Sequence, residues 1–389
     1  MELSNFIKKN NIINYIDLRN ILEKEPFNLK IKEDNYHKNL FLIHNCSNSD
    51  FNNKIVNECN GIILDKNTLK IVCYSFDKCS DEKNLPKNID IENLSIQYSI
   101  EGSLIRLYNY NGQWMISTKK CIDASKSKWI SNKNFVELFY DCLGDINLEC
   151  SINPSCCYSF IISHPENNII NKICIQRIYH ISTRLMTTLE EVTENIGLPF
   201  LEKNSINSNV IEFIKDLTLQ LSTDTLNFYE GYMFIDINYN RWKLQKPHIS
   251  NLRELWGNNN NRFFRYLELR KDANLLEKYL NYFDYDKLIF LKYERIIYNF
   301  VEVILEYYSR KHILKVDKNV PFYLSKIIYK LHGDYFKTKI KTNHNKIMLY
   351  LFDLEPKEIY FMINKYKEEV DKETIIKNNY DEKYVDMEI

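Results

Sequence analysis

The strongest constraint in this chain is a β-hairpin predicted over residues 103–118. Two runs of mostly β-favouring residues, 103–108 and 113–118, lie on either side of the dipeptide Asn111-Gly112. Asn-Gly between two such runs is the strongest short-range hairpin signal, because both residues tolerate the positive φ of a tight turn. A polar bend that contains glycine, residues 98–102, leads into the first strand. The sequence therefore predicts an antiparallel sheet here, with the bend presented at the mouth of the hairpin.

Strand and helix patterns fill the rest of the first 250 residues. Residues 1 to about 35 are expected to form one or two short helices. Residues 185–222 are predicted to be helical, with a helix stop at Gly197 and Pro199. The other elements predicted from the pattern are strands at 40–44, 61–65 and 70–74 and a helix at 134–143.

The pattern changes after Pro247. Apolar residues then recur at helical spacing, beginning with Phe263, Tyr266 and Leu267, and tyrosines are frequent. A chain of 389 residues is long enough for two domains. We therefore expect a first domain of residues 1–250, an all-α domain of residues 251–370 and a flexible tail of residues 371–389.

Composition limits the partners that the chain can have. Its 52 Lys and Arg residues balance 52 Asp and Glu residues, so RNA binding would have to come from a local patch of charge. No apolar run approaches the length of a membrane span, and we expect no membrane partner. The 10 cysteines include no C-x-x-C pair, which disfavours a zinc site and favours reduced thiols in a cytoplasmic protein.

The bend and the hairpin resemble a known family. The bend is similar to the K-x-D-G nucleophile motif of covalent nucleotidyltransferases. The sequence EGSLIRLY…GQWMISTKK is most similar to the RNA ligase branch, which includes ligase-like proteins of large DNA viruses. Residues 228–235, which contain Glu230-Gly231, resemble the family's E-G strand, and residues 241–246 resemble its lysine-bearing strand, so the resemblance implies strands at both places. The resemblance covers most of residues 1–250, whereas the helical half resembles the family only in its size and in the helical spacing of its apolar residues.

The resemblance implies a fold and a site. The implied fold is α+β, with twisted antiparallel sheets flanking a nucleotide cleft, and the implied cofactor is ATP or GTP with Mg²⁺. Lys246 alternates to the face opposite Lys243 along its strand. The implied contacts are nucleotide binding by Glu101, Gly102, Glu230, Lys243 and Lys246, metal ligation by Glu101 and Glu230, and RNA binding by Lys78, Lys119, Lys120, Lys126 and Lys128.

Several positions depart from the family together. Ser99 stands where the family has its adenylated lysine, and Asn60 and Asn168 each replace an arginine. A deprotonated lysine amine attacks the α-phosphorus of the nucleotide, and a serine hydroxyl is far less nucleophilic without a dedicated base. Ile161 replaces an acidic metal ligand, and Gln245 replaces a lysine that would neutralise the α-phosphate.

These changes favour a pseudoenzyme that binds RNA ends or nucleotide in RNA repair or messenger-RNA handling. Its helical domain would be available to a protein partner, and its expected setting is viral, in the host cytoplasm or the virion. Two alternatives stay open: an active RNA ligase or nucleotidyltransferase that uses Lys78 or Lys119, and a structural scaffold. Without the resemblance, the lysines after the hairpin would be a solvated face and the glycines ordinary bends at strand ends.

Overall fold

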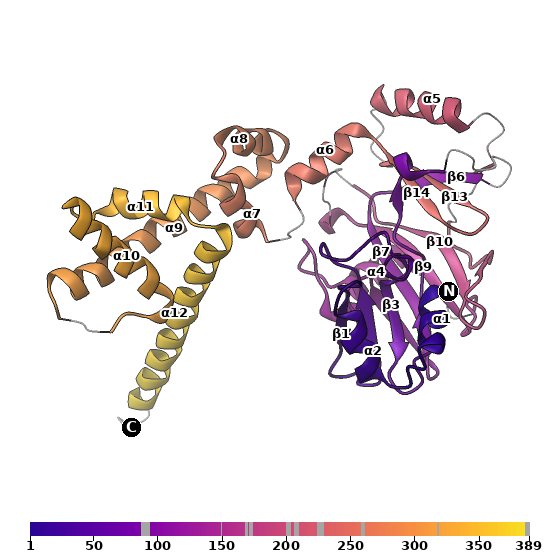
Figure 1. The fold of residues 1–389 in the computed structure, drawn as a ribbon, viewed down its shortest axis with the longest axis horizontal. Helices are drawn as coiled ribbons and strands as arrows, with labels where there is room; N and C mark the ends of the chain where they lie inside the picture. The colour runs from indigo at the N-terminus through magenta and orange to yellow at the C-terminus, as the bar shows by residue number, and fades with distance from the viewer. Residues whose placement is uncertain are drawn as a thin grey trace. The chain divides into compact units, whose positions relative to one another are not determined.

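The chain divides into two compact units, Met1–Arg253 and Glu254–Ile389, each described here by itself. The structure is a computed structural model and describes residues 1–86, 94–148, 150–167, 170, 174–199, 204–205, 210–223, 229–257, 261–316 and 319–385 (Figure 1). Asn168, which entered the sequence comparison, and Phe228, where one predicted strand began, lie outside the described residues.

The described residues of the first unit form three sheets, numbered here in chain order. Sheet 1 has the order β1 (Lys30–Glu33), β2 (Leu40–His44), β3 (Asn60–Asp65), β4 (Ile71–Cys73). Sheet 2 has the order β11 (Glu191–Val192), β10 (Arg177–Leu185), β9 (Cys156–Ser163), β7 (Ser103–Tyr110), β8 (Gln113–Thr118). Sheet 3 has the order β12 (Asn204–Ser205), β6 (Leu94–Ser99), β13 (Gly231–Asp236), β14 (Arg241–Gln245), β5 (Ser80–Asp81). Adjacent strands are antiparallel except for the short β5–β14 pair.

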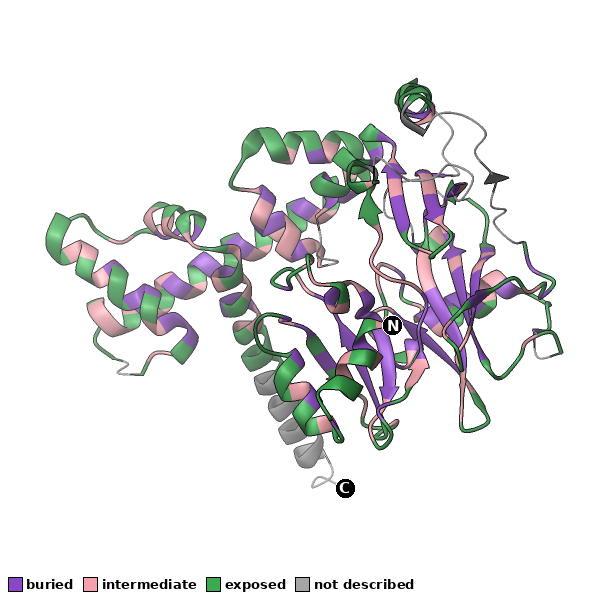
Figure 2. Cartoon of the chain, turned by 45° about the vertical axis from the view of Figure 1, so that its right-hand side comes forward, coloured by how far each residue is buried: buried purple, intermediate pink, exposed green. Residues whose placement is uncertain are grey.

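Sheets 1 and 2 pack face to face through a shared apolar core. Successive side chains of a strand point to opposite faces, so Leu40 and Leu42 of β2 turn toward sheet 2, where they share a core with Tyr108 and Met115. Phe41 and Ile43 turn to the other face of β2 and share a core with residues of two N-terminal helices. Figure 2 shows the resulting buried strands. Burial of each large apolar side chain is worth roughly 1.5–3 kcal/mol, so β2, buried on both faces, anchors this part of the unit.

Helices cover the outer faces of the sheets. Helices α1 (Glu2–Lys9) and α2 (Tyr15–Leu22) contribute Leu3, Leu18 and Leu22 to the core on sheet 1. Helix α4 (Phe135–Leu143) packs on sheet 2, and α5 (Val210–Thr223) contributes Leu217 and Leu221 to the core on sheet 3. Helix α3 spans Lys54–Glu58, and short 3₁₀ turns lie at Glu82–Asn84, Ala124–Lys126 and Pro165–Asn167.

The predicted hairpin is confirmed. Strands β7 and β8 pair in register up to Tyr110 and Gln113, and Asn111 and Gly112 both have positive φ, at 53° and 82°. These angles are those of the turn that joins twisted strands most easily. Strands β2, β3, β4, β13 and β14 and helix α4 confirm the other predicted elements at close to the expected bounds.

Three of the predictions for secondary structure are wrong or incomplete. Residues 185–222 were expected to be helical, but in the described part of this segment β11 and β12 precede the helix, which begins at Val210. Strand β11 pairs with β10, and such long-range strand contacts override local helical spacing. Strand β1 lies within the N-terminal segment expected to be helical, and β6 extends through Ser99, which was expected to lie in the bend.

The second unit is helical in its described residues, as expected. Its helices are the end of α6 (Pro247–Trp256), α7 (Arg262–Leu269), α8 (Ala273–Tyr282), α9 (Lys287–Tyr308), α10 (Phe322–Thr338), α11 (His344–Asp353) and α12 (Pro356–Val385), with a 3₁₀ turn at Asp284–Asp286 and a π-helical turn at Ser309–Ile313. Helix α12 runs through most of the segment predicted as a tail. Among the described residues, no helix has the length and apolarity needed to cross a membrane.

Candidate functional site

A row of three paired residues crosses sheet 3 at the end of its strands. Ser99 of β6 pairs with Gly231 of β13, and Gly231 pairs with Gln245 of β14. A Cβ at Gly231 would overlap the Leu244 carbonyl oxygen, so this position needs glycine. The Glu230 backbone N–H donates to the Ser99 carbonyl at 2.7 Å. The structure therefore brings together Ser99, the Glu230-Gly231 pair and the strand that carries Lys243 and Gln245.

Glu230 is a buried carboxylate already neutralised by two cations. Its Oε2 accepts from Lys243 Nζ at 2.5 Å, and its Oε1 pairs with the Arg253 guanidinium. Arg253 lies on α6, beyond the predicted domain end at residue 250, so the sequence analysis missed it. The available signal was Pro247, which favours the first turn of a helix and here starts α6 directly after β14.

Glu101 is buried and bonded to its own surroundings. Its Oε1 accepts from the Ile170 backbone N–H at 2.9 Å, and its carbonyl accepts from the Ser163 hydroxyl. Among the described residues, no group of three or more His, Cys, Asp or Glu side chains could hold a metal ion. A Mg²⁺ ion at Glu230 would have to displace Lys243 or Arg253, so the carboxylates in this arrangement do not fit the implied metal.

Three further predicted positions pack closely inside the unit. A Cβ at Gly102 would overlap the Ile162 carbonyl and would lie 2.6 Å from Ile161 Cγ2, so Ile161 sits directly beside this glycine. Lys246 is fully buried, with its Nζ 3.8 Å from the centre of the Tyr229 ring. Gln245 Nε2 is a buried donor without a hydrogen-bond partner among the described residues. A charged lysine at position 245 would bring a cation to this point.

Predicted RNA contacts gather at the end of β8 against sheet 1. Alternation along β2 turns His44 to the face that carries Leu40 and Leu42, toward sheet 2, and His44 pairs with Asn60 across a bulge. Gly61 in that bulge has φ +96°, and a Cβ there would lie 2.5 Å from the Lys119 carbonyl oxygen. Lys32 Nζ, from β1, donates to the Lys120 carbonyl at 3.0 Å. Four strands thus meet around His44.

The lysines near His44 bring together several positive charges. Burial first, and then the charges of Lys32, Lys120 and Lys119, lower the pKa of His44. Its Nδ1 bonds the Asn45 carbonyl at 2.8 Å, while its buried Nε2 has no hydrogen-bond partner among the described residues.

Lys119 is the most perturbed of these lysines. Burial first, and then the charge of Lys120, lower the pKa of Lys119 to about 8, with Lys78 and Arg106 acting in the same direction. Lys32, Lys119 and Lys120, whose charges act on His44, and Lys78, whose charge acts on Lys119, are called the lysine cluster below. A cluster of this kind is suited to an anion, because a bound negative charge relieves the repulsion among its members.

The other predicted RNA contacts differ from one another. Lys78 Nζ lies 3.2 Å from the centre of the Phe51 ring, and burial lowers its pKa. Lys126 is paired with Asp34 at 2.6 Å and Asp123 at 3.7 Å, so its charge is balanced locally. Lys128 is exposed. The sequence analysis thus identified part of the cluster and missed Lys32 and His44, which precede the hairpin by more than 50 residues.

Cys79 feels charge from both groups of residues. Burial raises the pKa of its thiol, and the charges of Arg241, Lys243 and Lys119 oppose that effect. Lys243 of the Glu230 group and Lys119 of the lysine cluster therefore both act on this one cysteine.

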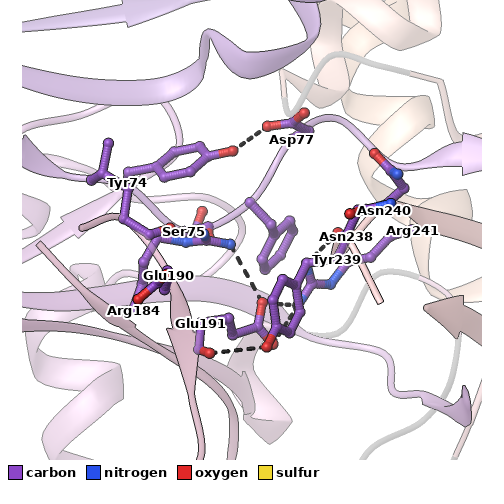
Figure 3. Close-up of polar contacts among 12 residues, drawn as sticks. Tyr74, Ser75, Asp77, Arg184, Glu190, Glu191, Asn238, Tyr239, Asn240 and Arg241 are labelled. Carbon is purple, nitrogen blue, oxygen red and sulfur yellow. Dashed lines mark hydrogen bonds and ion pairs between the residues drawn. The ribbon is translucent and has the colours of Figure 1, made fainter. Parts of the chain in front are cut away.

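A buried ion-pair network fixes β14 against sheet 2 (Figure 3). Glu191 of β11 accepts from Arg241 NH2 at 2.7 and 3.0 Å and pairs with Arg184 NH2 at 3.4 Å. Arg184 Nε donates to the Ser75 carbonyl at 2.7 Å, and the Tyr239 hydroxyl donates to the Glu191 carbonyl at 3.0 Å. Arg241 begins the strand that carries Lys243, so this network sets the place of that lysine.

Comparison with known proteins identifies viral relatives. No family model matches the sequence. Immediate-early protein ICP-46 homologs of Invertebrate iridescent viruses 3 and 6 are 26% identical over 247 residues and 23% identical over 250 residues. These matches cover 59% and 53% of this chain, and the chain spans about half the length of those relatives, 52% and 54%.

A third relative has an RNA ligase in its name. It is a protein of Autographa californica nuclear polyhedrosis virus, to which a bifunctional polynucleotide kinase/RNA ligase activity is ascribed. It is 33% identical over 113 residues, which cover 26% of this chain and 16% of that protein.

Solved ligases superpose at low scores. A structure ascribed to an ATP-dependent DNA ligase from Aquifex aeolicus aligns with 13% identity and a TM-score of 0.38, over 83% of this chain and 81% of that one. An archaeal ATP-dependent RNA ligase aligns with 10% identity and a TM-score of 0.36, over 72% and 69%.

Proposed function

We propose that this chain is a ligase-like protein that has lost nucleotidyl transfer and binds RNA ends. The observation that carries the proposal is the lysine cluster: Lys32, Lys119 and Lys120 all lower the pKa of His44, and among the described residues His44 Nε2 has no hydrogen-bond partner. RNA phosphates would neutralise Lys119, Lys120 and Lys32. The relative with polynucleotide kinase/RNA ligase in its name supports RNA as the ligand.

Loss of transfer follows from the residues around Ser99. A serine hydroxyl needs a dedicated base, and an ester-linked nucleotide would be a worse donor than a phosphoramidate. Glu230 is neutralised by Lys243 and Arg253, and Ile161 and Gln245 bring no charge to the neighbourhood. The Glu230 group in this proposal holds the end of sheet 3 in place beside the lysine cluster.

The test is RNA affinity as a function of salt. For single strands, log K falls by about 0.7 for each phosphate contact against log salt, so Lys119→Ala with Lys120→Ala should reduce the slope by about 1.4. Lys8→Ala with Lys9→Ala is the matched control, because these adjacent exposed lysines end α1 and the net charge changes equally. Fluorescence anisotropy with a short single-stranded RNA measures both the affinity and the slope.

Two results would contradict the proposal. If the wild-type protein has no measurable RNA affinity at low salt, the scaffold alternative replaces RNA binding. If the α1 control lowers the slope as much as the cluster variant does, the binding is non-specific attraction to surface charge and not a site.

A second candidate function, transfer through another lysine, is favoured by one observation. A nucleophilic lysine needs a lowered pKa, and burial together with Lys120 lowers that of Lys119 to about 8. We expect no covalent adduct when the protein is incubated with labelled ATP or GTP and Mg²⁺ or Mn²⁺ and then denatured. Stoichiometric labelling that is lost in Lys119→Arg, which keeps the positive charge, would establish transfer and overturn the pseudoenzyme proposal.

A further inference from the structure

Two cysteines touch in the core between sheets 1 and 2. Cys73, the last residue of β4, and Cys157 of β9 are both fully buried, and their Sγ atoms are 3.6 Å apart. They come from different sheets and are 84 residues apart in the sequence. Both belong to the same apolar core cluster, which also contains Leu42, Ile63 and Tyr108. The two cysteines therefore form a tertiary contact between sheets 1 and 2, and they are not neighbours along one strand.

A buried guanidinium lies beside this pair. Arg106 of β7 is almost fully buried; it donates to the Gly61 carbonyl and, at 2.6 Å, to the Thr118 carbonyl. Its Nε has no hydrogen-bond partner, and among the described residues no carboxylate pairs with it. A buried cation without an anion is costly, and a thiolate at Cys73 is the anion that this position can supply.

The two thiols are not equivalent. Burial by itself raises the pKa of Cys73, but the hydrogen bond with Cys157, the charge of Arg106 and the hydrogen bond with Ser117 together lower it below its ordinary value. The hydrogen bond with Cys73, followed by burial, raises the pKa of Cys157. Ser117 Oγ lies 3.7 Å from Cys73 Sγ. Cys73 therefore ionises first and Cys157 keeps the proton, which is the division of roles in a thiol pair that forms a disulfide.

We propose that Cys73 and Cys157 are an oxidation site at which a peroxide forms a disulfide between sheets 1 and 2. The Sγ atoms are in van der Waals contact, and forming the S–S bond would bring them to roughly 2.05 Å. This inference does not depend on RNA binding.

The oxidation balances in two steps. The Cys73 thiolate attacks one oxygen of hydrogen peroxide, the O–O bond breaks, and the departing hydroxide takes a proton and leaves as water. Cys73 is then a sulfenic acid, oxidised by two electrons. The sulfur of Cys157 attacks the Cys73 sulfur, the S–O bond breaks, and the hydroxide leaves with the Cys157 proton as a second water.

The disulfide would change how the first unit opens. It would tie β4 to β9 and close a loop that includes the whole β7–β8 hairpin together with Ser99 and Lys119. Cross-linking over a long loop removes conformations from the unfolded chain and raises the melting temperature. Because both thiols are buried, the oxidant reaches them only when the two sheets separate locally, so the reaction should be slower than at the exposed Cys150 and Cys174.

Peptide mapping of the full chain tests the proposal. The reduced protein is treated with hydrogen peroxide, free thiols are blocked with N-ethylmaleimide, and trypsin digestion without reductant releases Cys73 in the peptide 71–78, which has no other cysteine. We expect this peptide linked to the one containing Cys157, with a rise in melting temperature that dithiothreitol reverses.

Cys156 provides the matched control. It precedes Cys157 on β9 but turns to the opposite face, into the core beneath α4. Cys156→Ser should keep the cross-link and the melting shift, and Cys157→Ser should lose both. Fragment ions of the wild-type peptide that separate residues 156 and 157 give the same assignment if a variant does not fold.

Two outcomes would overturn the oxidation site. In one, peroxide fully oxidises Cys150 and Cys174 of the wild-type protein, but Cys73 in the 71–78 peptide stays a free thiol and is found alkylated by N-ethylmaleimide. The other is a cross-link to 71–78 that is assigned by its fragment ions to a cysteine other than Cys157.

Discussion

At the scale of single residues, Lys119 makes RNA binding depend on pH. Burial first, and then the charge of Lys120, lower the pKa of Lys119 to about 8, so the side chain is charged below that pH and loses its proton above it. Phosphate binds the protonated form. RNA affinity should therefore be nearly constant well below pH 8, begin to fall as the pH approaches 8, and fall by up to about tenfold per pH unit above it.

Anisotropy titrations from pH 7 to 9 at fixed ionic strength measure this dependence. His44 stays neutral across that window because burial lowers its pKa. Lys119→Arg is the matched variant, because arginine keeps its charge at every pH used. If RNA affinity falls with pH as steeply in Lys119→Arg as in the wild type, the titrating group is another one, such as Lys78, and this account of Lys119 is contradicted.

At the scale of elements, Gly61 sets the contact between sheet 1 and the end of the hairpin. It has φ +96°, and a Cβ would lie 2.5 Å from the Lys119 carbonyl oxygen. Gly61→Ala should cost about 1–3 kcal/mol of unfolding free energy and should weaken RNA binding, because Lys119 must move away from β3. Urea unfolding and the RNA titration measure the two effects.

The turn of the hairpin supplies the control for this variant. Gly112 also has a positive φ, +82°, but nothing lies within 4 Å of the Cβ that alanine would add. Gly112→Ala should cost about 1 kcal/mol from its backbone conformation alone and leave RNA affinity unchanged. Equal RNA affinity in Gly61→Ala and Gly112→Ala would show that the close approach of β3 to Lys119 has no part in binding.

The elements that could be predicted from the sequence are those with local signals. The Asn111-Gly112 turn predicted β7 and β8, short apolar runs predicted β2, β3 and β4, and the family resemblance predicted β13 and β14. Strands β6 and β10 lacked such a signal. They are held by pairing with β13 and β9, and long-range pairing leaves no mark in local spacing.

The site was predictable only in part for the same reason. Glu230 and Lys243 lie in recognisable motifs, and sheet 3 brings them together with Ser99. Arg253 and His44 lie in stretches with no motif and reach the site through α6 and through the bulge in sheet 1. Their roles depend on tertiary contacts, and a buried histidine nitrogen without a partner becomes visible only in three dimensions.

At the scale of the whole molecule, the first unit should lose stability in mild acid because of His180. This histidine of β10 is almost fully buried beside the Tyr158 and Phe160 rings, and its Nε2 lies 2.8 Å from the Thr183 hydroxyl. Burial lowers the pKa of His180 to about 4 from an ordinary value near 6.5. The unfolded chain therefore binds a proton between pH 6.5 and 4 that the folded unit does not bind.

The sign and size of the effect follow from this difference. The stability that neutral His180 contributes is fully present above pH 6.5 and is lost as the pH falls toward 4, by about 3 kcal/mol in all.

His180→Gln removes the titrating group and should make the loss of stability between pH 6.5 and 4 less steep. His248→Gln, at an exposed histidine of the same unit, should leave that loss unchanged. Urea unfolding from pH 7 to 4 measures the free energy of unfolding of each variant and of the wild type. Contributions from the helical unit cancel in the difference between the two. A decline of equal steepness in His180→Gln and wild type would show that other groups, and not His180, govern the acid stability of this protein.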